Sequence, residues 1–113
     1  MRRLTFALFL LASAAVAADP FTGDWQANVS NEGKSFSFVF HFEVKGATLT
    51  GTVELPSQDR EFPIEKGTVH GNDIAFQSLG LWHGTLAGDA IDLTRELDNG
   101  KTQHMTARRP AKR

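Results

Sequence analysis

Hydrophobic and polar side chains alternate along residues 35–45, and this period of two restricts the fold more than any other feature of the chain. An apolar residue occupies every second position here: Phe36, Phe38, Phe40, Phe42 and Val44. Such a segment places one face on a core and the other in water, which is typical of antiparallel β-strands. No pattern of period 3.6 and useful length follows residue 23. The sequence therefore indicates an all-β protein.

Turn signals recur roughly every 8 to 12 residues and divide the chain into eight predicted strands. These cover residues 23–29, 35–45, 48–55, 60–70, 73–78, 81–87, 90–97 and 102–109. Consecutive antiparallel strands joined by short turns close naturally into an up-and-down barrel, which leaves no sheet edge exposed. We therefore predict a single eight-stranded meander barrel, with a two-sheet β-sandwich as the alternative.

The hairpin turns predict the strand register. Centring the first hairpin on residues 46–47 places Phe42 opposite Gly51. It also places Phe40 opposite Val53, so that large inner side chains meet smaller ones, as a narrow barrel requires. 

The predicted fourth strand changes its inward parity along its length. Phe62 and Ile64 share one parity, whereas Val69 has the other. An extra residue is least costly beside a glycine, so we predict a β-bulge near Lys66 and Gly67.

The first 18 residues have the pattern of a signal peptide. A basic start precedes an apolar run over residues 4–11, and Ala15-Val16-Ala17 has the form that a signal peptidase recognises. The apolar run is too short to span a bilayer, so no stable membrane insertion is expected. We predict a signal peptide at residues 1–18 (cleaved after residue 17 or 18), a barrel domain at 19–109 and a basic tail at 110–113. The mature protein would be exported, either to the periplasm or to the medium.

Composition excludes several classes of function. The chain has no cysteine, which excludes disulfides, thiolate zinc sites and thiol nucleophiles. Removing Arg2 and Arg3 with the leader leaves 10 cationic side chains against 13 acidic ones, so no nucleic-acid partner is expected.

No catalytic or metal-binding constellation is visible in the sequence. The four histidines are scattered, and His41 and Glu43 face outward opposite Thr52 and Thr50, which are poor metal ligands. We therefore predict that the protein is not an enzyme and has no metal site and no cofactor.

Two short motifs resemble those of calycin barrels. Gly23-Asp24-Trp25 resembles the G-x-W element that opens the first strand of lipocalins, and Leu49-Thr50-Gly51-Thr52 resembles the corresponding stretch of avidin-type barrels. The chain is also similar to small exported bacterial barrels of unassigned function. The lipocalin resemblance implies that an arginine of the last strand, Arg109 or Arg108, packs over Trp25 at the closed end. It implies a fold and no activity.

The longer loops lie at the opposite end of the barrel, where we expect a mouth. Centring the hairpin on residues 88–89 places Trp82 opposite Arg95 with both side chains inward. An inward arginine must be paired or must reach the mouth, because burying its charge without a partner costs several kcal/mol. Its neighbour on the last strand is Gln103, or His104 if the final turn is shorter.

An inward cation among aromatic residues predicts a binding site at the mouth. The candidate residues are Trp82, Arg95, Gln103, Phe36, Leu55 and Phe62. The expected ligand is a small apolar or amphipathic molecule that can be anionic. The alternative is a protein partner, as for a periplasmic inhibitor or accessory protein with a solid barrel. Large inward side chains can fill eight strands completely, which favours a shallow site over a deep cup.

Overall fold

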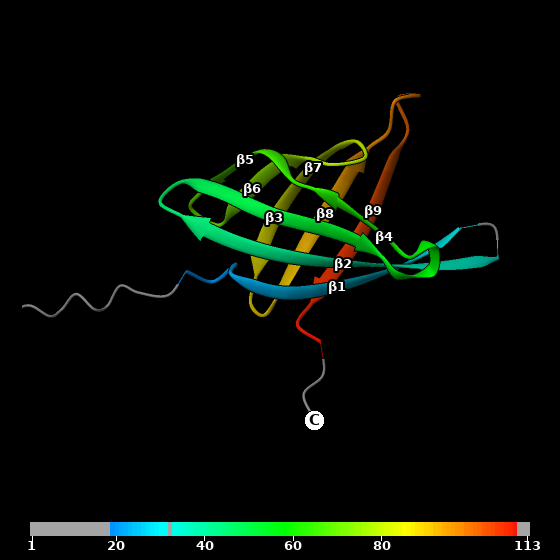
Figure 1. The fold of residues 1–113 in the computed structure, drawn as a ribbon, viewed down its shortest axis with the longest axis horizontal. Helices are drawn as coiled ribbons and strands as arrows, with labels where there is room; N and C mark the ends of the chain where they lie inside the picture. The colour runs from blue at the N-terminus through cyan, green and yellow to red at the C-terminus, as the bar shows by residue number, and fades with distance from the viewer. Residues whose placement is uncertain (1–18, 32, 111–113) are drawn as a thin grey trace, which may run out of the picture.

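The computed structural model describes residues 19–31 and 33–110, which fold into a closed antiparallel barrel (Figure 1). Its strands are β1 (Gly23–Asn31), β2 (Lys34–Lys45), β3 (Thr48–Leu55), β4 (Arg60–Pro63), β5 (Glu65–His70), β6 (Asp73–Gln77), β7 (Leu81–Ala87), β8 (Ala90–Glu96) and β9 (Thr102–Arg108). A 3-10 helix, Pro56–Gln58, connects β3 to β4. The predicted all-β, up-and-down barrel is confirmed, and this architecture is compatible with a calycin-like fold.

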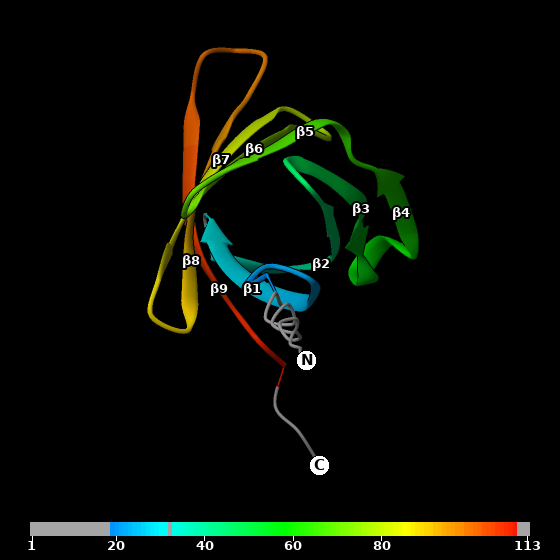
Figure 2. The same cartoon turned by 90° about the vertical axis from the view of Figure 1, so that its left-hand side faces the viewer.

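Eight strands close the ring, and one strand lies outside it. The ring runs β2-β1-β9-β8-β7-β6-β5-β3 and closes where β3 pairs with β2. Strand β4 pairs with β3 alone among the described strands, and Figure 2 shows it beyond β3 on the outside of the barrel. Within the described ranges, no helix is long and apolar enough to cross a bilayer. The predicted signal peptide (1–18) and most of the basic tail (111–113) lie outside the described residues.

The predicted hairpin registers are confirmed. Phe42 lies opposite Gly51 and Phe40 opposite Val53 in the β2–β3 hairpin. In the β7–β8 hairpin, Trp82 lies opposite Arg95. The turn glycines and the alternation of apolar residues agree at these positions, which is why the sequence alone determines the pairing.

The single strand predicted over residues 60–70 is wrong, because the structure has β4 and β5 in its place. Pro63 has no N–H to donate to a strand ladder, and Ile64, which separates β4 from β5, still donates its N–H to the Gly51 carbonyl of β3. The predicted bulge is confirmed: Lys66 has φ 54°, and the β5–β6 register shifts beside it. Gly67 permits the close approach to β3, since a Cβ at this position would collide with the carbonyl of Leu49.

Aromatic side chains from three strands fill the middle of the barrel. They are Phe38, Phe40 and Phe42 of β2, Phe76 of β6 and Trp82 of β7, and all five are buried. Phe40 meets Trp82 edge to face, with ring centroids 5.2 Å apart. Phe76 stacks on the same indole at 5.6 Å. Such contacts add to the hydrophobic gain from burial, so this cluster stabilises the barrel.

The closed end is sealed by the chain segment that precedes β1. The Arg109 guanidinium carbon lies 4.1 Å from the centre of the Trp25 ring. Arg109 also donates hydrogen bonds to the carbonyls of Thr22 (2.9 Å) and Pro20 (3.0 Å). The Trp25 indole N–H donates to the carbonyl of Phe21, whose own ring is fully buried. The sequence indicates the Trp25 contact but not Phe21, which lies ahead of the predicted first strand.

Replacing Phe40 by alanine tests whether the barrel is filled. We expect Phe40→Ala to lower the free energy of unfolding by about 3–5 kcal/mol, because the cavity cannot collapse within a closed sheet. Urea denaturation measures this change. The control is Phe62→Ala, which truncates a half-exposed ring of β4 and removes much less buried area. A loss under about 1 kcal/mol for Phe40→Ala would mean that the ring lines an existing void.

Candidate functional site

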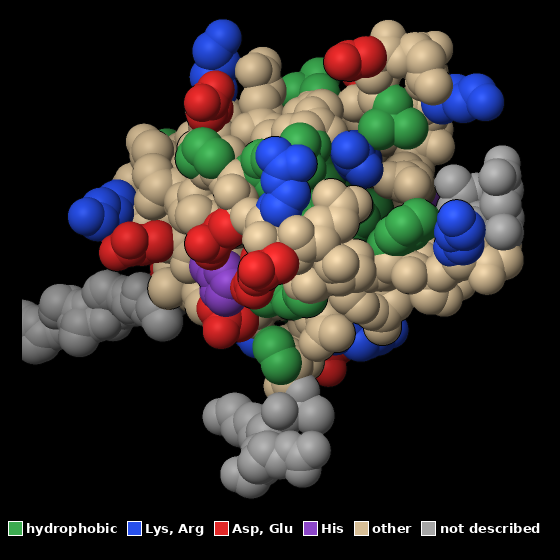
Figure 3. Space-filling model, turned by 45° about the vertical axis from the view of Figure 1, so that its right-hand side comes forward, with side chains coloured by type: hydrophobic (Ala, Val, Ile, Leu, Met, Phe, Trp, Pro, Cys, Tyr) green, Lys and Arg blue, Asp and Glu red, His purple; other side chains and the backbone are tan. Residues whose placement is uncertain are grey.

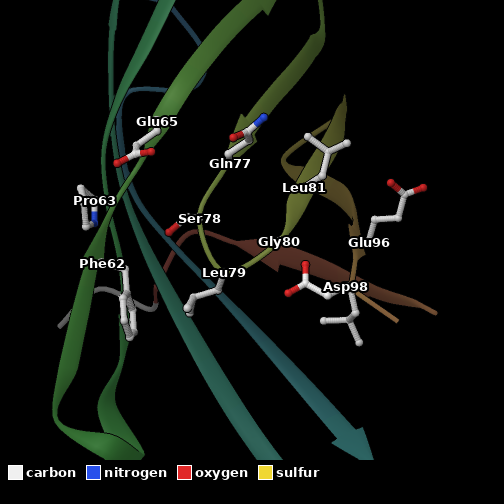
Figure 4. Close-up of a pocket in the computed structure, with 11 residues that line it drawn as sticks. Phe62, Pro63, Glu65, Gln77, Ser78, Leu79, Gly80, Leu81, Glu96 and Asp98 are labelled. Atoms are coloured by element: carbon white, nitrogen blue, oxygen red, sulfur yellow. The ribbon is translucent and has the colours of Figure 1, made fainter. Parts of the chain in front are cut away.

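A groove opens where β4 leaves the barrel wall. The second half of β3, residues 52–55, pairs with β4, whereas its first two residues, 48 and 49, pair with β5. Strand β6 pairs with β5 and not with β4, so nothing is hydrogen-bonded to the second edge of β4 within the described ranges. The resulting groove has a volume of about 540 Å³. Figure 4 shows Phe62 and Pro63 on one side of it, Leu81 and Glu96 on the other, and the β6–β7 turn between them.

Apolar side chains form part of the groove floor, beside polar groups. Phe62 of β4, Leu81 of β7 and Leu97, which follows β8, are each half-buried. Leu79 of the β6–β7 turn is the only large hydrophobic side chain of the described residues that is clearly exposed, at 38%. The groove can therefore accept an alkyl chain or a ring.

The rim of the groove is acidic. Glu65, Glu96 and Asp98 line it, and all three are exposed. None of these carboxylates forms an ion pair with a described residue. No lysine or arginine lines the groove. The lining itself therefore carries three negative charges and no positive one, but two guanidinium groups lie against it: Arg60 is 5.0 Å from the centre of the Phe62 ring, and Arg95 donates to the Leu79 carbonyl. Salt screens charges that face water.

The β6–β7 turn that crosses the groove is clamped in a strained shape. Leu79 has φ 55°, in the left-handed region that residues other than glycine rarely adopt, at a cost of roughly 1–3 kcal/mol. The Trp82 indole N–H donates to the Ser78 carbonyl at 2.6 Å, and Arg95 Nε donates to the Leu79 carbonyl at 2.7 Å. Ser78 N–H donates to the Gly80 carbonyl at 3.0 Å. The core thus holds Leu79 out toward solvent.

A hydroxyl without a partner lies in the same turn. Ser78 is 7% exposed, and its Oγ has no hydrogen-bond partner among the described residues. Leaving a buried hydroxyl unsatisfied costs about 1–3 kcal/mol. In Figure 4 its oxygen points toward the side of the groove formed by Phe62 and Pro63.

Arg95 supports the turn from inside the barrel. Its guanidinium carbon lies 5.6 Å from the ring centres of both Phe38 and Trp82. Nη1 donates to Oε1 of Gln103 at 3.1 Å, and Gln103 is directly opposite Arg95 on β9. Burial lowers the pKa of Arg95, and no described carboxylate pairs with it. Arg95 does not line the groove. It is a positioning residue for the Leu79 carbonyl.

Of the six residues proposed from sequence for the mouth, only Phe62 lines the groove. Trp82 is 0% exposed and belongs to the core, where a ligand cannot touch it without rearrangement. Phe36 and Leu55 are half-buried on β2 and β3 and lie away from the groove. The groove residues that sequence reasoning missed include the whole β6–β7 turn. The available signal was a lone leucine in the turn, Ser78-Leu79-Gly80.

The outer face carries one group of side chains that could hold a metal ion. The sequence places His41 beside threonines, but in the structure its two ring nitrogens contact Asp24 and Glu54. These hydrogen bonds to two carboxylates raise the pKa of His41, with burial acting weakly in the opposite direction. This group does not line the groove.

Replacing Arg95 by methionine tests its positioning role. We expect Arg95→Met to fold, to lose about 1–3 kcal/mol of unfolding free energy, and to speed amide exchange at Ser78, because the Leu79 carbonyl loses a charged donor. Thermal or urea unfolding and hydrogen exchange measure the two effects. The control is Arg108→Met, whose exposed pair with Asp89 spans 3.7 Å and stabilises little. Equal, small effects in the two variants would contradict the positioning role.

No protein-family model, curated protein or solved structure matches this chain.

Proposed function

We propose that this chain is an exported, non-enzymatic barrel that binds a small amphipathic molecule in the groove beside β4. In this proposal the apolar part of the ligand lies on the groove floor, and a cationic or hydrogen-bond-donating head faces the acidic rim. Export rests on the signal-peptide pattern of residues 1–18.

The observation that carries the proposal is the exposed, strained Leu79. A branched apolar residue in left-handed backbone is costly, and the cost is met by hydrogen bonds from two core side chains, Trp82 and Arg95. Local strain of this kind is concentrated at binding and catalytic sites. Leu79 is not part of the buried core and is 38% exposed, which supports a role in contacting a ligand.

The groove, and not the centre of the barrel, has enough volume to hold a small molecule. Its volume of about 540 Å³ lies within the range of roughly 300–1,000 Å³ that is typical of small-molecule sites. The barrel axis, in contrast, is occupied by the rings around Phe40 and Trp82. This favours a shallow side site over a deep lipocalin-like cup.

The charge of the groove favours a cation over the anion expected from sequence. That expectation assumed a free Arg95 at the mouth, but its Nε and Nη1 are bonded to Leu79 and Gln103. The groove itself offers three carboxylates, and attraction to each contributes roughly 0.2–1 kcal/mol at an exposed site.

The chemistry of the groove supports binding rather than catalysis. Ser78 is the one hydroxyl that lines it, and no general base lies within hydrogen-bond reach of Oγ in the described ranges. A serine without a base is a poor nucleophile. Its hydroxyl can instead bond to the head group of a ligand or to a water in the groove.

Two amphiphiles of opposite charge test the proposal. Isothermal titration calorimetry of the purified protein would compare decyltrimethylammonium with decanoate, both below their micelle concentrations. We expect the cation to bind about tenfold more tightly, because the combined attraction of the rim amounts to about 1.4 kcal/mol. The double variant Glu96→Gln/Asp98→Asn should reduce this preference to about threefold or less.

The matched control removes the same charge elsewhere. Glu43→Gln/Asp92→Asn neutralises two exposed outer-face carboxylates that do not line the groove, and it should keep the preference for the cation. Tighter binding of decanoate would contradict the acidic-rim site. Binding of neither amphiphile would contradict a small-molecule site and favour the alternative, a barrel that acts on a protein partner.

A further inference from the structure

Four neighbouring strands bring a histidine and three carboxylates together on the outer face of the barrel. His41 of β2 lies directly opposite Asp24 of β1, and its Nδ1 is 2.8 Å from Asp24 Oδ1. Its Nε2 is 3.1 Å from Oε1 of Glu54 on β3. Glu61 of β4 completes the group, and Figure 3 shows a histidine surrounded by acidic side chains. We call these four residues the outer-face cluster.

The register of the sheet places two carboxylates opposite each other in this cluster, and among the described residues only His41 forms an ion pair with one of them. Glu54 lies directly opposite Glu61 in the β3–β4 pairing, and like charges in that position destabilise a sheet. No lysine or arginine of the described residues forms an ion pair with either glutamate. Thr52 Oγ1 donates to Glu61 Oε2 at 2.8 Å, which holds this carboxylate toward the cluster instead of letting it turn away. The sheet thus concentrates negative charge around one imidazole.

The ligand types and their spacing fit a divalent transition metal. One ligating atom each from His41, Glu54 and Glu61 all lie within 4.8 Å of one another. Around a tetrahedral ion with bonds of about 2.0–2.2 Å, such atoms are about 3.3–3.6 Å apart, so rotation of the two flexible glutamates closes the site. Imidazole with carboxylates suits Zn²⁺ and its neighbours better than Mg²⁺ or Ca²⁺, which prefer sites made of oxygen alone.

We propose that His41 Nε2, Glu54 and Glu61 bind a zinc-type divalent ion, with Asp24 as the second-shell acceptor of the His41 Nδ1–H. Metal-binding histidines regularly donate their other ring N–H to a carboxylate, which fixes the ring and the tautomer. On binding, the metal takes the Nε2 lone pair, and any proton on that nitrogen is released to solvent. A water would occupy the fourth position, as in other three-ligand zinc sites.

The ion would fasten β4 to the barrel. Strand β4 pairs with β3 alone, and it carries Phe62, which forms one wall of the groove. Ligands from β2, β3 and β4 would join this outlying strand to two strands of the ring. The metal site does not depend on the proposed amphiphile site, because the two use different residues on β4.

Calorimetric titration of ZnCl₂ into the untagged, chelator-treated full chain at pH 7 tests the proposal. We expect one ion per chain with micromolar affinity or tighter, and no comparable binding of MgCl₂. Glu61→Gln should weaken binding at least tenfold, since it removes a ligand, and Asp24→Asn should weaken it about 10–100-fold through the second shell. Heats measured in buffers of different ionisation enthalpy report the released proton.

The controls separate this site from adventitious binding by surface histidines. His83→Gln alters an exposed histidine of β7 outside the cluster and should leave Zn²⁺ affinity unchanged. Circular dichroism of Glu61→Gln establishes that the variant is folded, so a loss of binding is attributable to the ligand. Unchanged affinity in Glu61→Gln, a loss in His83→Gln, or no binding by the unaltered protein would each overturn the proposal. These outcomes leave the amphiphile test unaffected.

Discussion

The packing of Trp82 into the aromatic centre of the barrel fills the space that a deep binding cup would need. With Phe40 at 5.2 Å and Phe76 at 5.6 Å, the indole occupies the position at which a wider barrel would have a cavity. Its N–H reaches the Ser78 carbonyl and so anchors the β6–β7 turn. One buried side chain therefore closes the axis of the barrel and shapes the groove on its flank.

The groove also depends on the departure of β4 from the ring. A regular fourth strand would pair with both of its neighbours and leave no opening. Pro63 removes a donor from the ladder, and the bulge at Lys66 redirects the chain before β5 pairs with β6. The proline and the bulge thus produce the groove on which the proposed function depends.

Strand β4 connects the two proposed sites, although neither needs the other. Its inner face carries Phe62 toward the groove, and its outer face carries Glu61 toward the outer-face cluster. Both places gather carboxylates, in keeping with the excess of acidic over basic residues in 19–113. Such a distribution favours cations over anions, in agreement with both proposals.

Much of the fold could be predicted from the sequence, because most hairpins have a glycine turn flanked by alternating residues; the β3–β4 connection, Pro56–Gln58, is an exception. Registers such as Trp82 opposite Arg95 follow from symmetry about a turn and need no knowledge of the rest of the chain. The site depends on contacts that local pattern does not encode. Leu79 is exposed because a core side chain holds its carbonyl. His41 contacts Glu54, its diagonal neighbour on β3, although the residue directly opposite His41 is a threonine.

The position of a bound amphiphile tests the central claim most directly. Nuclear Overhauser effects between decyltrimethylammonium and the protein would locate its alkyl chain. The filled-barrel account predicts contacts with Leu79 and Phe62 and an unchanged environment for the Trp82 indole. Contacts with Phe40 or Trp82 would place the chain along the barrel axis and contradict it.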